Sequence, residues 1–190
     1  AMRGRMKAKA EAQGVKLSYM PFFMKAVIGA LRQFPIFNAS LDDATNEIIV
    51  RKSLHMGFAA ATDNGLLVPV VKHADQKSIL QIAREMGEIA ERTRNGKATS
   101  DELSGSTFTI SNVGSIGGLF ATPIINHPEV AILGVNALKK RPVVMPDGSI
   151  QARDMMYLGL SFDHRVTDGA EAVKFLNAIT ERQTQPQAAS

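Results

Sequence analysis

The stretch from Ser161 to Gly169, Ser-Phe-Asp-His-Arg-Val-Thr-Asp-Gly, carries the residue types best suited to proton transfer. It holds one imidazole, two carboxylates and one guanidinium. The apolar pattern predicts a strand over Asp154–Phe162 and a helix over Ala170–Thr180, which places His164 on the turn between them. Neutral histidine is the usual general base near pH 7. Because two regular elements would hold this turn, His164 is the leading candidate for a catalytic base.

Asp168 admits two structural interpretations. With Glu171 three residues later, it matches the pattern of a helix N-cap, and capping alone would explain this aspartate. Alternatively, Asp168 caps the helix and also pairs with Arg165, which would fix the turn that aims His164. Asp163 is interpreted as an ordinary charge at the end of the strand.

Ser111 is a second candidate for chemistry. It ends a strand predicted over Thr107–Ser111 and precedes a glycine-rich loop, Gly114–Gly118. Small polar residues favour turns, so the residues alone favour a plain strand end; the alternative is a hydroxyl donor to a developing oxyanion. The loop lacks the Lys-Ser/Thr of a P-loop and the Gly-x-Gly-x-x-Gly pattern, so we expect it to serve close backbone packing.

Composition excludes several classes of protein. The chain has 190 residues, enough for one domain with a real core, and no cysteine, which excludes a disulfide scaffold, a cysteine nucleophile and a thiolate metal site. The four histidines are far apart in the sequence, so we expect no metal. No apolar run approaches the ~18 residues of a membrane span. There is also no Gly-x-Ser-x-Gly elbow of a serine hydrolase.

The charge balance is slightly basic. Lys and Arg number 22 against 18 acidic residues, for a net charge of +4. An ordinary solvated surface is the favoured interpretation, and attraction to an anionic, phosphate-bearing ligand is the alternative. Basic residues are dispersed and only 6% of residues are aromatic, so we expect no nucleic-acid partner.

The order of predicted elements indicates one α/β or α+β domain with a mixed sheet. Antiparallel signals include an Asn-Gly hairpin within Thr62–Gly65 and a turn at Pro146–Ser149. Residues 1–183 form the predicted domain, and residues 184–190 form a polar, disordered tail. The other predicted elements are helices over Met2–Gln13, Ser18 to Phe34 and Ser78 to Asn95, and strands over Glu47–Arg51, His55–Thr62, Leu66–Lys72, Val130–Val135, Pro142–Met145 and Ile150–Ala152.

Four ordered blocks carry a resemblance to a known family. They are Asp63–Val70, Thr107–Gly118, Pro123–Gly134 and His164–Gly169, the last with the pattern His-Arg-x-x-Asp-Gly. Their order and spacing resemble the dihydrolipoamide acyltransferase (E2) catalytic domain of 2-oxo acid dehydrogenase complexes over nearly the whole chain.

The resemblance implies a chloramphenicol-acetyltransferase-like fold, a mixed-sheet sandwich with flanking helices. It also implies a homotrimer with active sites between subunits, which coenzyme A and dihydrolipoamide enter from opposite ends. The family's catalytic histidine falls on His164, its supporting aspartate on Asp168 and its oxyanion-stabilising hydroxyl on Ser111, contributed by a neighbouring subunit. Acyl transfer between the lipoyl group, carried on a separate domain, and coenzyme A is the implied reaction.

The chain departs from the family pattern at both ends. By this resemblance we expect the chain to begin inside the family domain, and to lack both the lipoyl and subunit-binding domains, through which E1 and E3 would be reached, and the apolar tail that joins trimers. We therefore expect a trimer rather than a 24- or 60-subunit cage. As substrate, an acetyl group is favoured over a branched-chain acyl group. The alternative function is a catalytically silent scaffold trimer, and an antibiotic-acetylating enzyme of the same fold is the least favoured interpretation. Bacterial cytoplasm is favoured over mitochondrial matrix.

Overall fold

The computed structural model describes residues 2–63 and 65–184. The helices are α1 (Met2–Glu11), α2 (Met20–Gln33), α3 (Ile79–Arg94) and α4 (Gly169–Thr184), with 3-10 turns η1 (Pro35–Phe37), η2 (Ala74–Gln76), η3 (Asp101–Leu103) and η4 (Gly114–Ile116). The strands are β1 (Ala39–Asp42), β2 (Glu47–Val50), β3 (Met56–Phe58), β4 (Ala60–Thr62), β5 (Gly65–Leu67), β6 (Val70–Val71), β7 (Phe108–Asn112), β8 (Ala131–Val135), β9 (Lys139–Val144), β10 (Ile150–Met155) and β11 (Leu158–Phe162).

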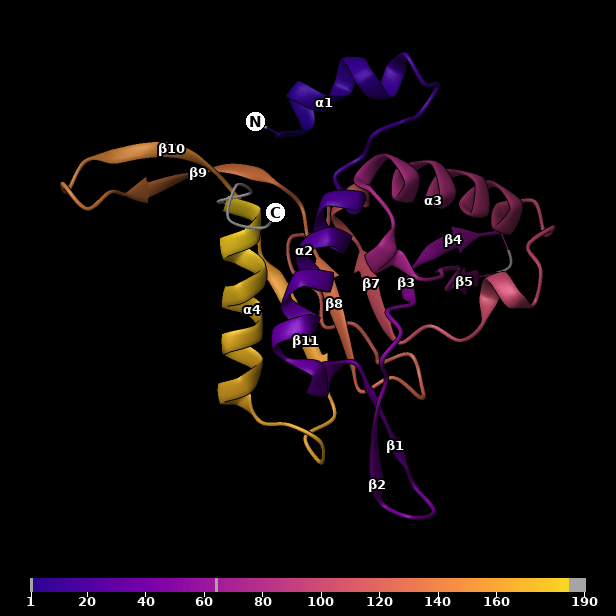
Figure 1. The fold of residues 1–190 in the computed structure, drawn as a ribbon. Helices are drawn as coiled ribbons and strands as arrows, with labels where there is room; N and C mark the ends of the chain where they lie inside the picture. Colours follow the sequence, from indigo (N-terminus) through magenta and orange to yellow (C-terminus); the bar gives the residue numbers. More distant parts are fainter. Residues whose placement is uncertain (1, 64, 185–190) are drawn as a thin grey trace.

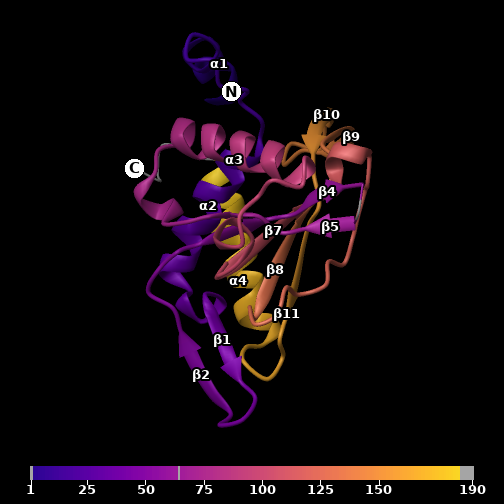
Figure 2. The ribbon, with the colours of Figure 1, turned by 90° about the vertical axis from the view of Figure 1, so that its right-hand side faces the viewer.

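A five-stranded mixed sheet organises the molecule, with the order β11-β8-β7-β3-β6 (Figure 1). The strands β3, β7 and β8 run parallel to one another, and the two edge strands pair antiparallel. The predicted mixed α/β fold is therefore confirmed. Two hairpins extend from the body, β1–β2 at one end and β9–β10 at the other (Figures 1 and 2).

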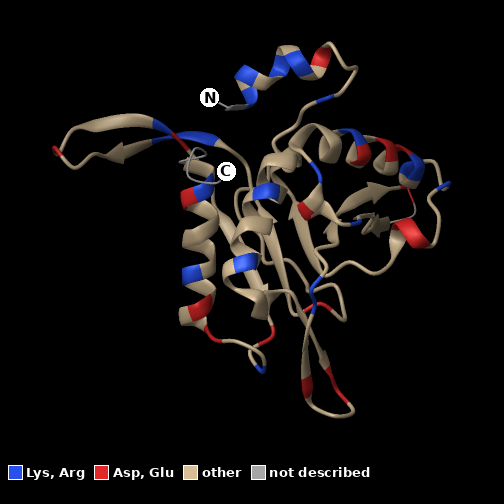
Figure 3. Cartoon of the chain, viewed as in Figure 1, with Lys and Arg blue, Asp and Glu red and all other residues tan. Residues whose placement is uncertain are grey.

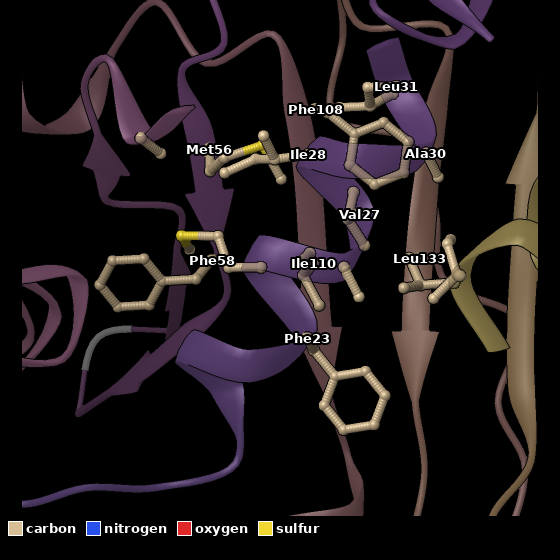
Figure 4. Packing of buried hydrophobic residues seen from close by; sticks show 14 of the residues in the cluster. Phe23, Val27, Ile28, Ala30, Leu31, Met56, Phe58, Phe108, Ile110 and Leu133 are labelled. Carbon is tan, nitrogen blue, oxygen red and sulfur yellow. The ribbon is translucent and has the colours of Figure 1, made fainter. Parts of the chain in front are cut away.

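The main core lies between the sheet and the helices α2 and α4. Figure 4 shows the apolar face of α2 against side chains of β3, β7 and β8. On α4, Phe175 is fully buried and stacks on Phe37 with ring centroids 4.4 Å apart, while Phe108 of β7 lies 5.8 Å away. Aromatic contacts of this kind add to the burial energy, so α4 is held firmly and its N-terminus has a fixed position.

Two glycines, one in β8 and one in β11, let the segment that joins β7 to β8 in the sequence approach the sheet closely. Gly134 of β8 pairs with Gly159 of β11. A Cβ at Gly159 would lie 2.7 Å from the carbonyl oxygen of Ala121, and one at Gly134 would lie 3.3 Å from Pro123. The crossover between the parallel strands β7 and β8 therefore packs closely against the sheet and contains only the short 3-10 turn η4, where an α-helix is usual.

Local signals were reliable at helix ends. Ser78 and Gln81 form the predicted capping box at the start of α3, and Gly14 ends the turn after α1 with a φ of 66°. The helix α2 begins at Met20, two residues after the predicted Ser18. The pairing of Thr62 with Gly65 confirms the hairpin, although Asn64 itself lies outside the described residues.

Three strand predictions need correction. The strand predicted over Asp154–Phe162 is two strands, because β10 pairs only with β9 and β11 pairs with β8 in a different sheet. The predicted strand over His55–Thr62 likewise divides into β3 and β4, and the one over Leu66–Lys72 into β5 and β6. A continuous apolar run cannot show where a chain leaves one sheet for another. At the C-terminus α4 continues through Thr184, one residue into the predicted tail, and residues 185–190 lie outside the described part.

A buried carboxylate just before β8 ties the loop that leads into β8 to β7 and the residues that precede β7. Glu129 is only 6% exposed, and its Oε1 accepts hydrogen bonds from Ser106, from Thr109 Oγ1 at 2.7 Å and from Asn126 Nδ2 at 3.0 Å. Its Oε2 is buried with no partner among the described residues. Burial raises the pKa of Glu129, and the three hydrogen bonds oppose that rise.

We expect Glu129→Gln to change how stability depends on pH. Because the folded-state pKa lies above the usual 4.5, the native state binds more protons than the unfolded state as pH rises from 4.5. The free energy of unfolding therefore falls as the pH rises from 4.5 through the folded-state pKa of Glu129. The total loss is about 1.4 kcal/mol for every ten-fold difference in proton affinity between the folded and unfolded states. Urea unfolding from pH 4 to 8 should show the Glu129→Gln chain gaining stability relative to the parent. A pH-independent difference, equal to that of the exposed control Glu11→Gln, would contradict this.

Candidate active site

His164 lies on the turn between β11 and α4, as predicted. The backbone N–H of Asp163 donates to the carbonyl of Val130 at 2.8 Å, so the turn begins from a fixed point beside β8. The imidazole is exposed, packs at 5.5 Å from the ring of Phe162, and makes no hydrogen bond to any residue that the structure describes. An open pocket beside it is lined by Ile36 and by residues 164–168 and Glu171. The ring is thus free to accept a proton from a bound molecule.

Asp168 caps α4. Its Oδ1 accepts a hydrogen bond from the backbone N–H of Glu171 at 3.0 Å, and this bond lowers the pKa of Asp168, with a smaller effect from the charge of His164. The N-cap interpretation is therefore confirmed. A carboxylate at this place keeps a negative charge within the turn that carries the imidazole.

The alternative in which Asp168 also pairs with Arg165 is wrong. The guanidinium of Arg165 instead binds both oxygens of Asp163, at 2.7 to 3.1 Å, and Asp43 Oδ1 at 3.0 Å. These bonds lower the pKa of Asp163 and raise that of Arg165. Asp163 is therefore more than a strand-end charge. No spacing rule could have found Asp43, which lies 122 residues before Arg165.

Ser111 lies near the end of β7, two residues after Thr109, whose hydroxyl binds Glu129. Its side chain is half-buried, and the hydroxyl makes no hydrogen bond within the described residues. The chain after it turns through η4, where Ser115 N and Oγ bond to Asn112. The hydroxyl is therefore presented at a shaped strand end and is free to donate to another molecule.

Within one chain, Ser111 and His164 lie near opposite ends of the sheet. Ser111 pairs with Gly134, whereas Phe162 pairs with Ala131, three residues earlier on β8. Three residues along a strand and two steps between strands separate Ser111 from Phe162 by about 14 Å. His164 lies two residues further on. The two groups could act on one substrate only if they came from different copies of the chain.

The other features of the surface do not add to this site. A pocket beside the base of the β1–β2 hairpin is lined by Arg51, His55 and Glu129 among others, but by none of the three predicted site residues. Across residues 2–63 and 65–184, no three His, Cys, Asp or Glu side chains are grouped to hold a metal ion. No helix in that part of the chain has the length and apolar character to cross a membrane. Basic and acidic residues are intermixed along α3 in the view of Figure 3.

Sequence comparison finds close relatives. A family model described as 2-oxoacid dehydrogenases acyltransferase (catalytic domain) matches residues 1–189. The dihydrolipoyllysine-residue acetyltransferase component of the pyruvate dehydrogenase complex from Staphylococcus aureus is 48% identical over 185 residues, which cover 97% of this chain and 43% of that protein. The chain thus spans less than half the length of this relative.

Structural comparison agrees. A solved Azotobacter vinelandii dihydrolipoamide acetyltransferase, studied for the roles of a serine, a histidine and an asparagine in its catalytic mechanism, superposes with a TM-score of 0.95 and 44% identity, covering 99% of this chain and 77% of that one. The cubic core of a pyruvate dehydrogenase multienzyme complex matches equally well. Chloramphenicol acetyltransferase, with a TM-score of 0.54 and 16% identity over 92% of this chain and 81% of its own, shares the fold alone.

These comparisons confirm the predicted fold and the family resemblance. The family model extends over nearly the whole chain, and the relatives' folds agree with it from α1 to α4. The chain therefore belongs to the catalytic-domain family of the 2-oxoacid dehydrogenase acyltransferases.

Proposed function

We propose that this protein transfers an acetyl group between dihydrolipoamide and coenzyme A. The observation that carries the proposal is the pair of free polar groups, the imidazole of His164 and the hydroxyl of Ser111, each presented at an end of the sheet. Family membership supports the reaction class. The acetyltransferase component from Staphylococcus aureus supports the choice of acetyl group and, with it, a role in a bacterial cytoplasmic pyruvate dehydrogenase complex.

The reaction follows from these two groups. A free thiol with a pKa near ~8.5 is mostly protonated at pH 7, so His164 takes the proton from the sulfur of coenzyme A. The thiolate attacks the thioester carbonyl of acetyl-dihydrolipoamide, and Ser111 donates a hydrogen bond to the oxyanion. Collapse of this intermediate forms acetyl-coenzyme A and breaks the bond to the dihydrolipoamide sulfur. That sulfur recovers the proton from the imidazolium, so no acyl-enzyme is needed.

The Azotobacter vinelandii enzyme supports these assignments by its spacing. The asparagine named in its mechanism lies four positions after the named histidine, as Asp168 lies four after His164. The serine-to-histidine spacing there agrees within one position with that of Ser111 and His164. An aspartate replaces the asparagine in this chain, which leaves the capping function intact because both residue types are good N-caps.

Assembly into a trimer would bring the two groups together. The loop after Ser111 exposes large apolar side chains: Ile116 is 87% exposed, Ile124 90%, and Phe120 is also exposed. Several large apolar side chains exposed along one loop are typical of a surface that a partner covers, so a partner surface is expected here. A second copy covering this loop supplies the His164 that one chain cannot supply to its own Ser111.

An acyl-transfer assay on the purified protein tests the proposal. We expect transfer from acetyl-coenzyme A to dihydrolipoamide, faster than from isobutyryl- or succinyl-coenzyme A. Ser111→Ala should lower kcat by about 10²-fold with little change in KM, because the lost hydrogen bond forms fully only in the transition state. A change in KM alone would argue against the oxyanion role. A trimer by gel filtration with no transfer from any of the three thioesters would support the scaffold alternative instead.

A further inference from the structure

We propose that Asp43, at the tip of the β1–β2 hairpin, is a positioning residue that acts through Arg165 on His164. The inference rests on the proposed function, since it concerns the same imidazole. Among the described residues, Asp43 forms no hydrogen bond or ion pair with His164, Asp168 or Ser111. It is joined to the turn between β11 and α4 by the hydrogen bond and ion pair with Nη1 of Arg165.

Arg165 uses its whole fork to join the two elements. Its Nε and Nη2 bind the carboxylate of Asp163, and the backbone N–H of Arg165 also donates to Asp163 Oδ1 at 2.9 Å. The remaining Nη1 donates to Asp43 Oδ1 at 3.0 Å. His164 lies between Asp163 and Arg165 in the sequence, so the Asp163 carboxylate holds the backbone beside the imidazole, and the Asp43 carboxylate holds the Arg165 side chain that completes this contact. Such bidentate pairs fix geometry as well as adding energy.

The hairpin tip is shaped to present Asp43. Asp42 Oδ1 accepts the backbone N–H groups of Ala44 at 2.9 Å and Thr45 at 3.4 Å, and Asn46 adopts a left-handed φ of 56°. This local order means that little entropy is lost when Asp43 binds Arg165.

The base of the hairpin is also anchored. Ser40 forms a β-bridge to Glu129, and Asn38 Nδ2 donates to the carbonyls of Arg51 at 2.8 Å and Ser53 at 3.0 Å. The hairpin and the catalytic turn lie at the same end of the molecule in Figures 1 and 2. The β1–β2 hairpin therefore contacts the body at two places. Its base pairs with Glu129 just before β8, and Asp43 at its tip binds the turn between β11 and α4.

The exposure of the Asp43–Arg165 pair distinguishes a positioning role in catalysis from a role in the stability of the fold. The side chains of Arg165 and Asp43 are 64% and 62% exposed, and ion pairs so exposed contribute little to folding. Catalysis is more sensitive, because a displacement of about 1 Å can cost up to about 10²-fold in rate. Loss of the Asp43 contact should therefore lower the rate and leave the unfolding transition unchanged.

The test compares Asp43→Ala, Asp43→Glu, Arg165→Met and the double variant in the transfer assay. We expect Asp43→Ala to lower kcat about ten-fold with KM unchanged, and Asp43→Glu, which still reaches the guanidinium, to restore most of it. In the Arg165→Met background, removing Asp43 should cost no more than about two-fold, because the contact is already lost. The matched control is Glu11→Ala, which breaks the pair with Lys7, equally exposed at 65% and 62% on α1. It should keep the parental kcat.

Three outcomes would overturn the inference. They are a parental kcat in Asp43→Ala, a loss confined to KM, and a loss of rate that accompanies dissociation on gel filtration, which would assign Asp43 to assembly. Failure of the proposed function looks different. In that case His164→Ala itself keeps the parental rate, whereas failure of the present inference alone leaves His164→Ala inactive and Asp43→Ala active.

Discussion

Replacing His164 with alanine is expected to lower kcat for acetyl transfer by about 10³-fold, within the range that general acid–base catalysis contributes. The imidazole is exposed and hydrogen-bonded to no described residue, so its removal leaves the turn, the cap at Asp168 and the core unchanged. The thiol of coenzyme A would then have no base in reach. Initial rates with saturating acetyl-coenzyme A and dihydrolipoamide measure the loss.

The pH dependence of the residual rate identifies the missing group. Without a base, the reaction depends on thiol that has already ionised in solution, so the rate of His164→Ala should keep rising toward pH ~8.5 while the parent levels off. An unfolding midpoint equal to that of the parent is the control for structure. A rate near the parental value would remove the basis of the proposed mechanism.

Mixed trimers show whether the histidine and the serine come from different chains. His164→Ala and Ser111→Ala are each expected to be nearly inactive alone. When both are co-expressed in equal amounts, about three quarters of cyclic trimers contain both kinds of subunit, and each of these has one intact site of three. Activity should then recover to about one quarter of the parental value. If both residues acted within one chain, mixing would restore nothing.

Much of the site was predictable because its signals are local. The turn that holds His164 follows from an apolar strand, a helix stripe and an Asp-Gly cap within about 30 residues of sequence, and local patterns of this kind report reliably on element type. The same holds for the capping box of α3. The role of Ser111 was not visible in this way. A serine at a strand end is ordinary, and only its position in the sheet shows that it cannot meet His164 within one chain.

What the sequence could not predict depends on contacts between distant segments. Arg165 could have bound Asp168, three residues away, or Asp163, and the structure shows a third carboxylate from a hairpin 122 residues earlier. Likewise Glu129 looks like an ordinary surface charge in sequence, yet it is buried and accepts a hydrogen bond from Thr109 of β7, 20 residues earlier. Charged residues are rarely buried, so composition favours the wrong answer in such cases.

Gly114→Ala is expected to destabilise the protein by about 3 kcal/mol, at the upper end of the cost of overpacking. The added methyl would overlap the backbone carbonyl of Asn136 and lie 2.7 Å from the backbone nitrogen of Ala137. Neither atom can move aside as a flexible side chain would, because Asn136 is buried and its Nδ2 donates to the carbonyl of Tyr157 at 2.9 Å. Urea unfolding measures the change.

Gly87→Ala is the matched control. Gly87 lies in the middle of α3 with open space around its Cα, so alanine there should stabilise the fold by about 1 kcal/mol through helix propensity. Opposite signs for the same chemical change would show that packing at Gly114, and not the loss of glycine, is responsible. The consequence for function follows from position, because the loop that Gly114 opens begins three residues after Ser111. Gly114→Ala should therefore also lower kcat. If Gly114→Ala were as stable as the parent, the loop would not pack against Asn136. The hydroxyl of Ser111 would then have no fixed position from which to donate a hydrogen bond.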